Sequence, residues 1–172
     1  MKKQGSIEFI HLCQKFLSMN ALELKVPPVA AALLIASAMW FASSAVPSSI
    51  EAALVARVIA AAILAVVGAG IGLAGVASFR NARTTVNPTR PGATSVLVGS
   101  GVYRISRNPM YLGILLILFA WATFLSHPLA FVLAAVFVPC MTRFQIAPGE
   151  RILAAMFGAE FVDYRARVRR WL

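Results

Sequence analysis

Long apolar runs separated by short polar segments form the pattern of this chain, and they predict helices that cross a membrane. Four such runs are visible, at about residues 26–46, 52–79, 110–125 and 129–142. A spanning helix needs about 20 mostly apolar residues, which the first two runs supply and the last two nearly supply. Pro27 and Pro28 fall in an opening turn, where proline is tolerated. Only Ser126-His127-Pro128 separates the last two runs, so we expect a tight helical hairpin there.

Composition favours a membrane protein over a soluble domain. Of the 172 residues, 60% are hydrophobic and 13% are charged, whereas soluble domains are about 45–50% apolar and about 25% charged. The length suits one compact unit. The predicted fold class is therefore an all-α, polytopic membrane protein with about four transmembrane helices and a C-terminal helical segment in the cytoplasm or at the interface.

We divide the chain into an N-terminal interfacial segment, residues 1–25, and an integral membrane domain, residues 26–172. The first segment begins Met-Lys-Lys, but charged residues interrupt it and no small-residue cleavage site follows, so it does not resemble a signal peptide. Its apolar side chains suggest a short amphipathic helix lying on the membrane. They are Ile7, Ile10, Phe16 and Leu17. A disordered or a packed terminal helix is the alternative.

The placement of basic residues predicts the orientation of the bundle. The segments before the first run, between the second and third, and after the fourth hold 15 of the 16 Lys and Arg residues, and the connections 47–51 and 126–128 hold none. The positive-inside rule then places both termini and the 80–109 loop in the cytoplasm, and a bacterial inner membrane is the expected location. Arg57 is the exception. It either snorkels to the outer interface, which we favour, or lines a polar cavity.

The net charge of +10 raises nucleic acid as a partner, but the position of the charge argues against it. Basic residues beside a bilayer surface suit anionic lipid headgroups, and no nucleic-acid-binding module is visible. We therefore expect membrane lipids, and not nucleic acid, as partners, and the oligomeric state stays open. No metal is expected, because the cysteines and histidines show no ligand spacing. They are Cys13, Cys140, His11 and His127.

Glycines at residues 68–75 match the pattern G-x-G-x-x-G. A dinucleotide-binding fingerprint needs a preceding strand and a βαβ unit, whereas this string lies inside an apolar spanning run. Gly68 and Gly72 stand one turn apart on one helix face, which allows another helix to approach closely. The string therefore predicts helix packing.

The stretch 101–113 is the most informative polar segment. Arg104 and Arg107 stand three residues apart, directly before Asn108 and Pro109. Asparagine is a good N-cap and proline suits the first helical position, so a membrane helix is expected to begin here. The free N–H groups of a helix start, together with two arginines, could hold a carboxylate or phosphate. A positive anchor with a well-formed cap is the alternative interpretation.

A second polar stretch covers residues 143–172. Pro148 and Glu150 suit a helix start, and Gly158 predicts a break between two short helices. Glu150 and Glu160 are among only six acidic residues in the chain. Each could hold the ammonium of a cofactor that resembles an amino acid, or could compensate a helix dipole.

The two polar stretches together resemble the isoprenylcysteine carboxyl methyltransferase family, within the broader group that includes phospholipid N-methyltransferases. The family pattern has an R-H-P-x-Y element, then E-E-x-x-L, F-G-x-x-Y and a closing R-V-x-R segment. The corresponding residues are Arg107-Asn108-Pro109-Met110-Tyr111, Gly149-Glu150-Arg151-Ile152-Leu153, Phe157-Gly158-Ala159-Glu160-Phe161 with Tyr164, and Arg167-Val168-Arg169-Arg170-Trp171. The resemblance covers roughly residues 80–172. Asn108 replaces the family histidine, and Gly149 replaces the first glutamate.

The resemblance implies an enzyme that uses S-adenosylmethionine at the cytoplasmic face, with a lipophilic acceptor arriving from the bilayer. The cofactor-binding residues it implies are Arg107, Asn108, Pro109, Tyr111, Arg143, Gln145 and Glu150. The catalytic candidates are Arg104 and Arg107, which could orient a carboxylate acceptor such as an isoprenylcysteine, and Glu150, which could serve as a base for an amine acceptor, as could Glu160. Methyl transfer is an in-line displacement that a dry, positioned site favours, which suits a chain without a Ser-His-Asp set.

Three other functions fit the same residues. A phospholipid N-methyltransferase would share the cofactor. A reductase of the sterol type has similar terminal elements and would bind NADPH instead. A non-catalytic membrane binding protein could keep the fold after losing activity, and Gly149 is the feature that favours it.

Overall fold

The computed structural model describes residues 23–46, 50, 53–82 and 97–172, and these residues are almost entirely helical. Within these ranges the only β-type pairing is one isolated parallel bridge between Ser106 and Arg169. The predicted all-α class is therefore confirmed. Residues 1–22, which make up most of the predicted interfacial segment, lie outside the described residues.

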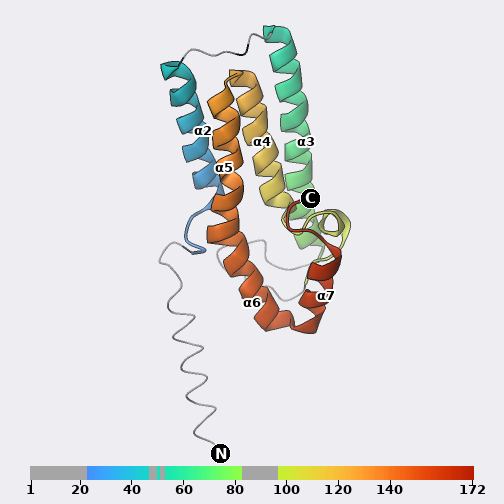
Figure 1. Cartoon of the computed structure of the whole chain (residues 1–172). Coiled ribbons are helices and arrows are strands. Elements are labelled where there is room, and N and C mark those ends of the chain that lie inside the picture. Colours follow the sequence, from blue (N-terminus) through green and yellow to red (C-terminus); the bar gives the residue numbers. More distant parts are fainter. Residues whose placement is uncertain (1–22, 47–49, 51–52, 83–96) are drawn as a thin grey trace, which may run out of the picture.

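Four apolar helices lie side by side and form the bundle (Figure 1). They are α2 (Pro28–Ala45), α3 (Leu54–Asn81), α4 (Pro109–Leu125) and α5 (Pro128–Met141). Each boundary falls within two residues of the prediction. The helices α2, α3 and the continuous helix Pro128–Phe157 are long and apolar enough to cross a membrane, and α4 is slightly shorter. The chain is an integral membrane protein by this criterion.

The fourth span does not stop where its apolar run ends. A π-helical turn, η3 (Thr142–Ile146), carries α5 directly into α6 (Ala147–Phe157). Pro148 lies in the first turn of α6, as predicted, but no break precedes it. Pro148 has no N–H, so it cannot donate the usual helical hydrogen bond to the carbonyl four residues earlier, that of Phe144. The carbonyl of Phe144 instead accepts a hydrogen bond from the Leu24 N–H at 2.9 Å, and the wider turn places the Ala147 N–H on the Thr142 carbonyl. Both groups are thereby satisfied.

Glycines bring α3 and α4 into close contact. A Cβ added to Gly113 would lie 2.5 Å from the Gly68 carbonyl oxygen and 2.9 Å from the Gly72 nitrogen, and one added to Gly68 would lie 2.8 Å from the Gly113 oxygen. Such backbone contact is open only to residues without a side chain. The glycine string lies inside α3 and packs against α4, so the packing interpretation is confirmed.

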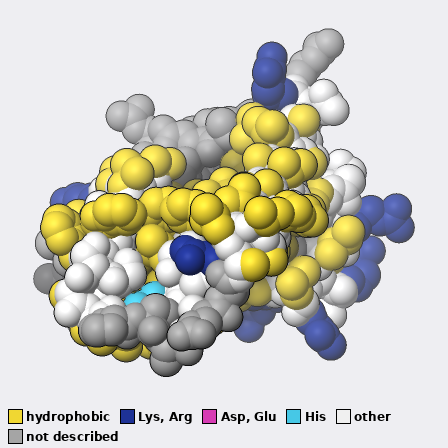
Figure 2. Space-filling model, turned by 90° about the horizontal axis from the view of Figure 1, so that it is seen from above, with side chains coloured by type: hydrophobic (Ala, Val, Ile, Leu, Met, Phe, Trp, Pro, Cys, Tyr) yellow, Lys and Arg dark blue, Asp and Glu magenta, His cyan; other side chains and the backbone are white. Residues whose placement is uncertain are grey.

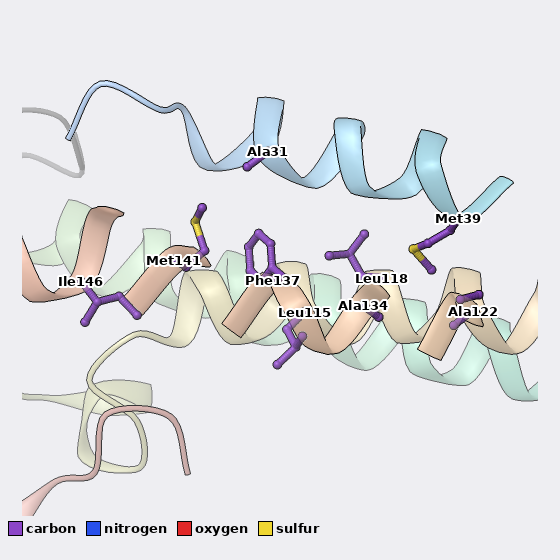
Figure 3. Packing of buried hydrophobic residues seen from close by; sticks show 10 residues of the cluster. Ala31, Met39, Leu115, Leu118, Ala122, Ala134, Phe137, Met141 and Ile146 are labelled. Atoms are coloured by element: carbon purple, nitrogen blue, oxygen red, sulfur yellow. The ribbon is translucent and has the colours of Figure 1, made fainter. Parts of the chain in front are cut away.

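Apolar side chains from α2, α4 and α5 form the main core (Figure 3). Phe137, Met39 and Met141 are its largest fully buried members. By contrast, α3 contacts the bundle mainly through α4 and leaves most of its apolar surface exposed. An exposed apolar surface of this kind suits lipid tails.

Polar groups close the end of the bundle that holds the α4–α5 turn. His127 accepts the Leu129 N–H on Nδ1, and its Nε2 lies 3.1 Å from the Val46 carbonyl oxygen. Arg57 donates from Nε to the Phe124 carbonyl oxygen at 2.9 Å and lies over the Phe124 ring. It therefore caps the end of α4, and its snorkelling to the outer interface stays a prediction. Figure 2 looks onto this end and shows a broad band of hydrophobic side chains with histidine atoms among the polar groups.

Candidate functional site

The two polar stretches meet at the other end of the bundle. The 97–108 connection includes a 3₁₀ turn, η2 (Gly101–Arg104), and it lies beside α6, α7 (Ala159–Arg167) and the C-terminal segment, residues 168–172 (Figure 1). The Arg107 N–H donates to the Arg169 carbonyl at 3.0 Å, next to the bridge between Ser106 and Arg169. The described parts of both stretches therefore lie at one end of the bundle, and their place at the cytoplasmic surface stays a prediction.

A small apolar cluster holds α7 against the connection. Phe161, Tyr164 and Val168 are buried together, and the Tyr164 hydroxyl donates to the Tyr103 carbonyl at 2.8 Å. Burial raises the pKa of Tyr164 to about 12, so its hydroxyl remains a donor even at a pH where an exposed tyrosine would ionise. The predicted break at Gly158 is confirmed, because this residue adopts a φ of 51° between α6 and α7. The turn at Gly158 lets α7 fold back toward residues 101–107.

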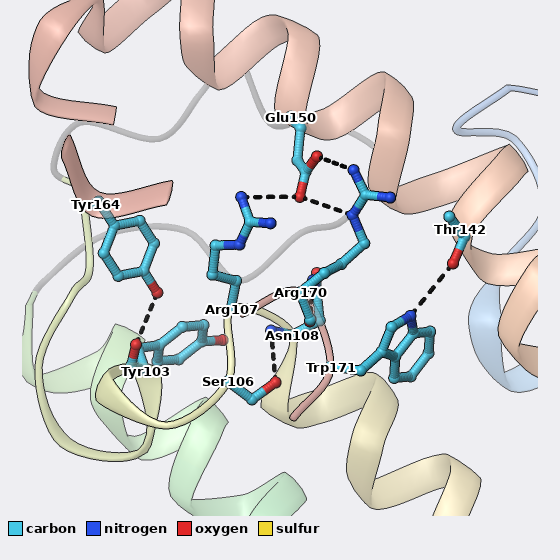
Figure 4. Close-up of polar contacts among 9 residues, drawn as sticks. All are labelled: Tyr103, Ser106, Arg107, Asn108, Thr142, Glu150, Tyr164, Arg170 and Trp171. Carbon is cyan, nitrogen blue, oxygen red and sulfur yellow. Dashed lines mark hydrogen bonds and ion pairs between the residues drawn. The ribbon is translucent and has the colours of Figure 1, made fainter. Parts of the chain in front are cut away.

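Glu150 joins two arginines at the centre of the site (Figure 4). Its carboxylate lies 3.3 Å from Arg107 Nη1 and accepts from Arg170 at 3.2 Å (Nε) and 2.6 Å (Nη2). The side chains of Arg107 and Glu150 are 10% and 12% exposed, and that of Arg170 is 36% exposed. Burial lowers the pKa of Arg107, whereas the hydrogen bonds that Arg170 donates to Glu150 raise the pKa of Arg170.

The cluster of Arg107, Arg170 and Glu150 has a net positive charge. Arg107 and Arg170 contribute two positive charges and Glu150 one negative charge. Among the described residues, Arg107 Nε and Nη1 are buried and have no hydrogen-bond partner, since the contact of Nη1 with Glu150 is an ion pair only. Buried guanidinium donors favour a planar anion such as a carboxylate. The residues present therefore fit the carboxylate end of an amino-acid-like cofactor or of an acidic acceptor.

The structure brings together three of the predicted site residues: Arg107, Asn108 and Glu150. Asn108 stands at the N-cap of α4, as predicted, but its side chain makes no capping hydrogen bond. Its side-chain amide instead donates to the Arg170 carbonyl at 2.9 Å, because the chain carries residues 168–172 past it. Pro109 is buried at the first position of α4, and Tyr111 packs against the main core.

The other predicted residues contact different partners. Arg104 is exposed. Arg143 pairs with Glu23, and the Gln145 amide donates to the Val26 carbonyl, so both face the segment that leads into α2. Their roles in cofactor binding stay predictions. The Gln145 Oε1 atom is buried without a partner within the described ranges.

Sequence reasoning missed three contributors. Glu23 is 4% exposed and binds both Arg143 and Arg151, and its hydrogen bond with Arg143 holds its pKa below the usual range. Its place among only six acidic residues was a usable signal. Arg170 and Trp171 belong to the closing motif, but nothing in the sequence indicated their partners. For the part of the chain that is described, no group of three or more metal-ligating side chains occurs.

Comparison with known proteins bears on the same region. A family profile described as phospholipid methyltransferase matches residues 56–160. An uncharacterized protein of Haemophilus influenzae is 44% identical over 63 residues, which are 37% of this chain and the full length of that protein. No solved structure matches. The family match includes Arg107 and Glu150 and ends before Arg170.

Proposed function

Because the chain belongs to the phospholipid methyltransferase family, we propose that it transfers the methyl group of S-adenosylmethionine to a lipophilic acceptor at the cytoplasmic face of the membrane. When bound, S-adenosylmethionine supplies a methyl group activated on a sulfonium. The observation that carries the proposal is the buried Arg107, whose Nε and Nη1 lack hydrogen-bond partners in the described structure beside a cluster with one excess positive charge.

The residues of the chain would position reactants rather than exchange protons. Arg107 would bind a carboxylate through Nε and Nη1, which make no hydrogen bond within the described residues, and Glu150, which is ion-paired with Nη1, would fix the direction of that guanidinium. The cluster is largely buried, and electrostatic interactions strengthen where water is excluded. Arg143 and Gln145 lie within about two helical turns before Glu150, and their cofactor contacts remain part of this proposal.

A carboxylate acceptor, such as that of an isoprenylcysteine, is the acceptor that we propose. Methylation of an amine needs a base, but Glu150 is already held by two guanidinium groups and Glu160 is exposed on α7. A carboxylate acceptor needs no base, and the net positive charge of the cluster would attract it. The phospholipid amine is the second candidate, because the description of the matching family favours it.

Calorimetric titration of the full chain in detergent with S-adenosylhomocysteine tests the cofactor. We expect Arg107→Met to weaken binding about ten- to a hundredfold, since a hydrogen bond to a charged group contributes about 1.5–3 kcal/mol. Arg167→Gln is the matched control, because this arginine is exposed on α7 and should leave the affinity unchanged. Equal affinities for both variants would remove Arg107 from the cofactor-binding residues, and tight binding of NADPH instead would favour the reductase.

The acceptor is tested in vesicles with methyl-labelled S-adenosylmethionine and two candidates, an S-farnesylcysteine derivative and phosphatidylethanolamine. A methyl ester releases labelled methanol in mild base, whereas an N-methyl group does not. We expect base-labile label on the farnesylcysteine derivative. Base-stable label on phosphatidylethanolamine would overturn the carboxylate proposal and leave the methyltransferase proposal standing.

A further inference from the structure

The backbone of the C-terminal segment, residues 168–172, is hydrogen-bonded to residues of the site. Arg107 donates its N–H to the Arg169 carbonyl at 3.0 Å, and Asn108 donates its side-chain amide to the next carbonyl, that of Arg170, at 2.9 Å. Two neighbouring residues thus hold two neighbouring carbonyls of a segment about sixty residues away. At its start, Val168 is buried with Phe161 and Tyr164.

The two side chains that follow leave this segment toward different elements. Arg170 reaches Glu150 on α6, and the Trp171 indole N–H donates to Thr142 Oγ1 in η3 at 3.3 Å. Trp171 also packs against the main core of the bundle, and Figure 4 shows its hydrogen bond to Thr142. The direction of Arg170 and the position of Trp171 therefore both depend on where the backbone of this segment is held.

We propose that Asn108 is a positioning residue: it holds the C-terminal segment so that Arg170 neutralises Glu150 and leaves Arg107 free to bind an anion. The side-chain amide of Asn108 makes no cap bond to α4, and its backbone N–H is already satisfied by Ser106 Oγ at 3.2 Å. The hydrogen bond from the Asn108 side-chain amide to the Arg170 carbonyl is therefore what links Asn108 to the site. The direct cofactor contact expected for Asn108 stays a separate prediction.

The charge of the cluster explains why the link matters. With Arg170 in place, two guanidinium groups face one carboxylate and the cluster keeps one excess positive charge. If the segment is released, Glu150 keeps only Arg107 and the pair is neutral. A carboxylate ligand then loses both its net attraction and the donors that turn toward Glu150. This inference rests on the proposed function for the identity of that ligand, but not for the position of the segment.

The test uses the full chain in detergent, labelled with 5-fluorotryptophan. The chain has three tryptophans, so three ¹⁹F resonances are expected, and Trp171→Phe assigns the one of interest. We expect Asn108→Ala to shift the Trp171 resonance toward that of an exposed indole while the other two stay in place. Asn108→His, which restores a side-chain N–H, should return it. Arg169→Gln is the control, because that residue is held through its carbonyl and its side chain is exposed.

The same variants are titrated with S-adenosylhomocysteine. We expect the affinity of Asn108→Ala to fall about three- to tenfold, the range that one hydrogen bond supports, and that of Asn108→His and Arg169→Gln to match the wild type. An unmoved Trp171 resonance, or a moved resonance with unchanged affinity, would overturn the proposal. If the wild type itself does not bind, the proposed function fails, and the Trp171 resonance alone decides whether Asn108 holds the segment.

Discussion

Replacing Gly113 by alanine tests how closely α3 and α4 pack. The added Cβ would lie 2.5 Å from the Gly68 oxygen, 2.9 Å from the Gly72 nitrogen and 3.0 Å from the Gly72 Cα. All three atoms belong to the backbone, so no side chain can turn away. Ordinary carbon contacts begin near 3.5 Å, and the two helices would have to separate by roughly 1 Å. Overpacking of this kind costs about 1–3 kcal/mol.

Gly70→Ala is the matched control. A Cβ at Gly70 meets nothing within 4 Å, so this variant gains the helix propensity of alanine, about 0.5–1 kcal/mol, without a clash. Gly113→Ala gains the same propensity, and the difference between the two variants isolates the packing cost. Contact between backbones matters most in a membrane, where burial from water does not drive helices together.

The measurement is the temperature at which the monodisperse peak is lost on size-exclusion chromatography after heating in detergent. A difference of about 1–3 kcal/mol corresponds to roughly 2–10 °C for a chain of this length. We expect Gly113→Ala to be the less stable variant by that amount. Equal midpoints for the two variants would show that α3 and α4 are not in backbone contact at Gly113.

Three further predictions concern charge and space. The pKa of Tyr164 is raised to about 12 from 10, so the neutral form of this side chain stabilises the folded state. Its contribution to stability should be intact below pH 10 and be lost as the pH rises through 12. Over that pH range, the thermal midpoint of Tyr164→Phe should fall less steeply than that of the wild type. Glu23→Gln leaves Arg143 and Arg151 without their carboxylate and should lower stability by about 1 kcal/mol, since both arginines are half exposed. Because the pKa of Glu23 is depressed, the wild type should lose this contribution as the pH falls below 4.5. The control, Asp163→Asn on the exposed face of α7, should show neither effect. Gly149→Glu restores the family residue where a Cβ meets open space, so its thermal midpoint should match the wild type, and a clear drop would show that the position is enclosed.

The spanning helices could be predicted from the sequence because run length and apolar content alone determine them. The same reasoning located the break at Gly158, where the backbone needs a positive φ. It could not show that α5 continues into α6. That continuity depends on the Leu24 N–H, which reaches the Phe144 carbonyl from about 120 residues away in the sequence. No local pattern records such a partner.

The candidate site divides in the same way. Motif resemblance selected Arg107 and Glu150, which the structure places 3.3 Å apart. It could not show that Arg170 shares the carboxylate, or that the amide of Asn108 turns away from α4 to hold Arg170. Those contacts depend on how α7 folds back against the 97–108 connection, and a linear pattern contains no information about that approach.

The net positive charge of the cluster formed by Arg107, Arg170 and Glu150 has a consequence for turnover. A guanidinium that attracts a carboxylate has much less attraction for the uncharged ester made from it, because esterification removes both the negative charge and the second equivalent oxygen. If a carboxylate is the acceptor, methylation itself lowers the affinity of the site for its product, and the lipophilic ester can return to the lipid phase.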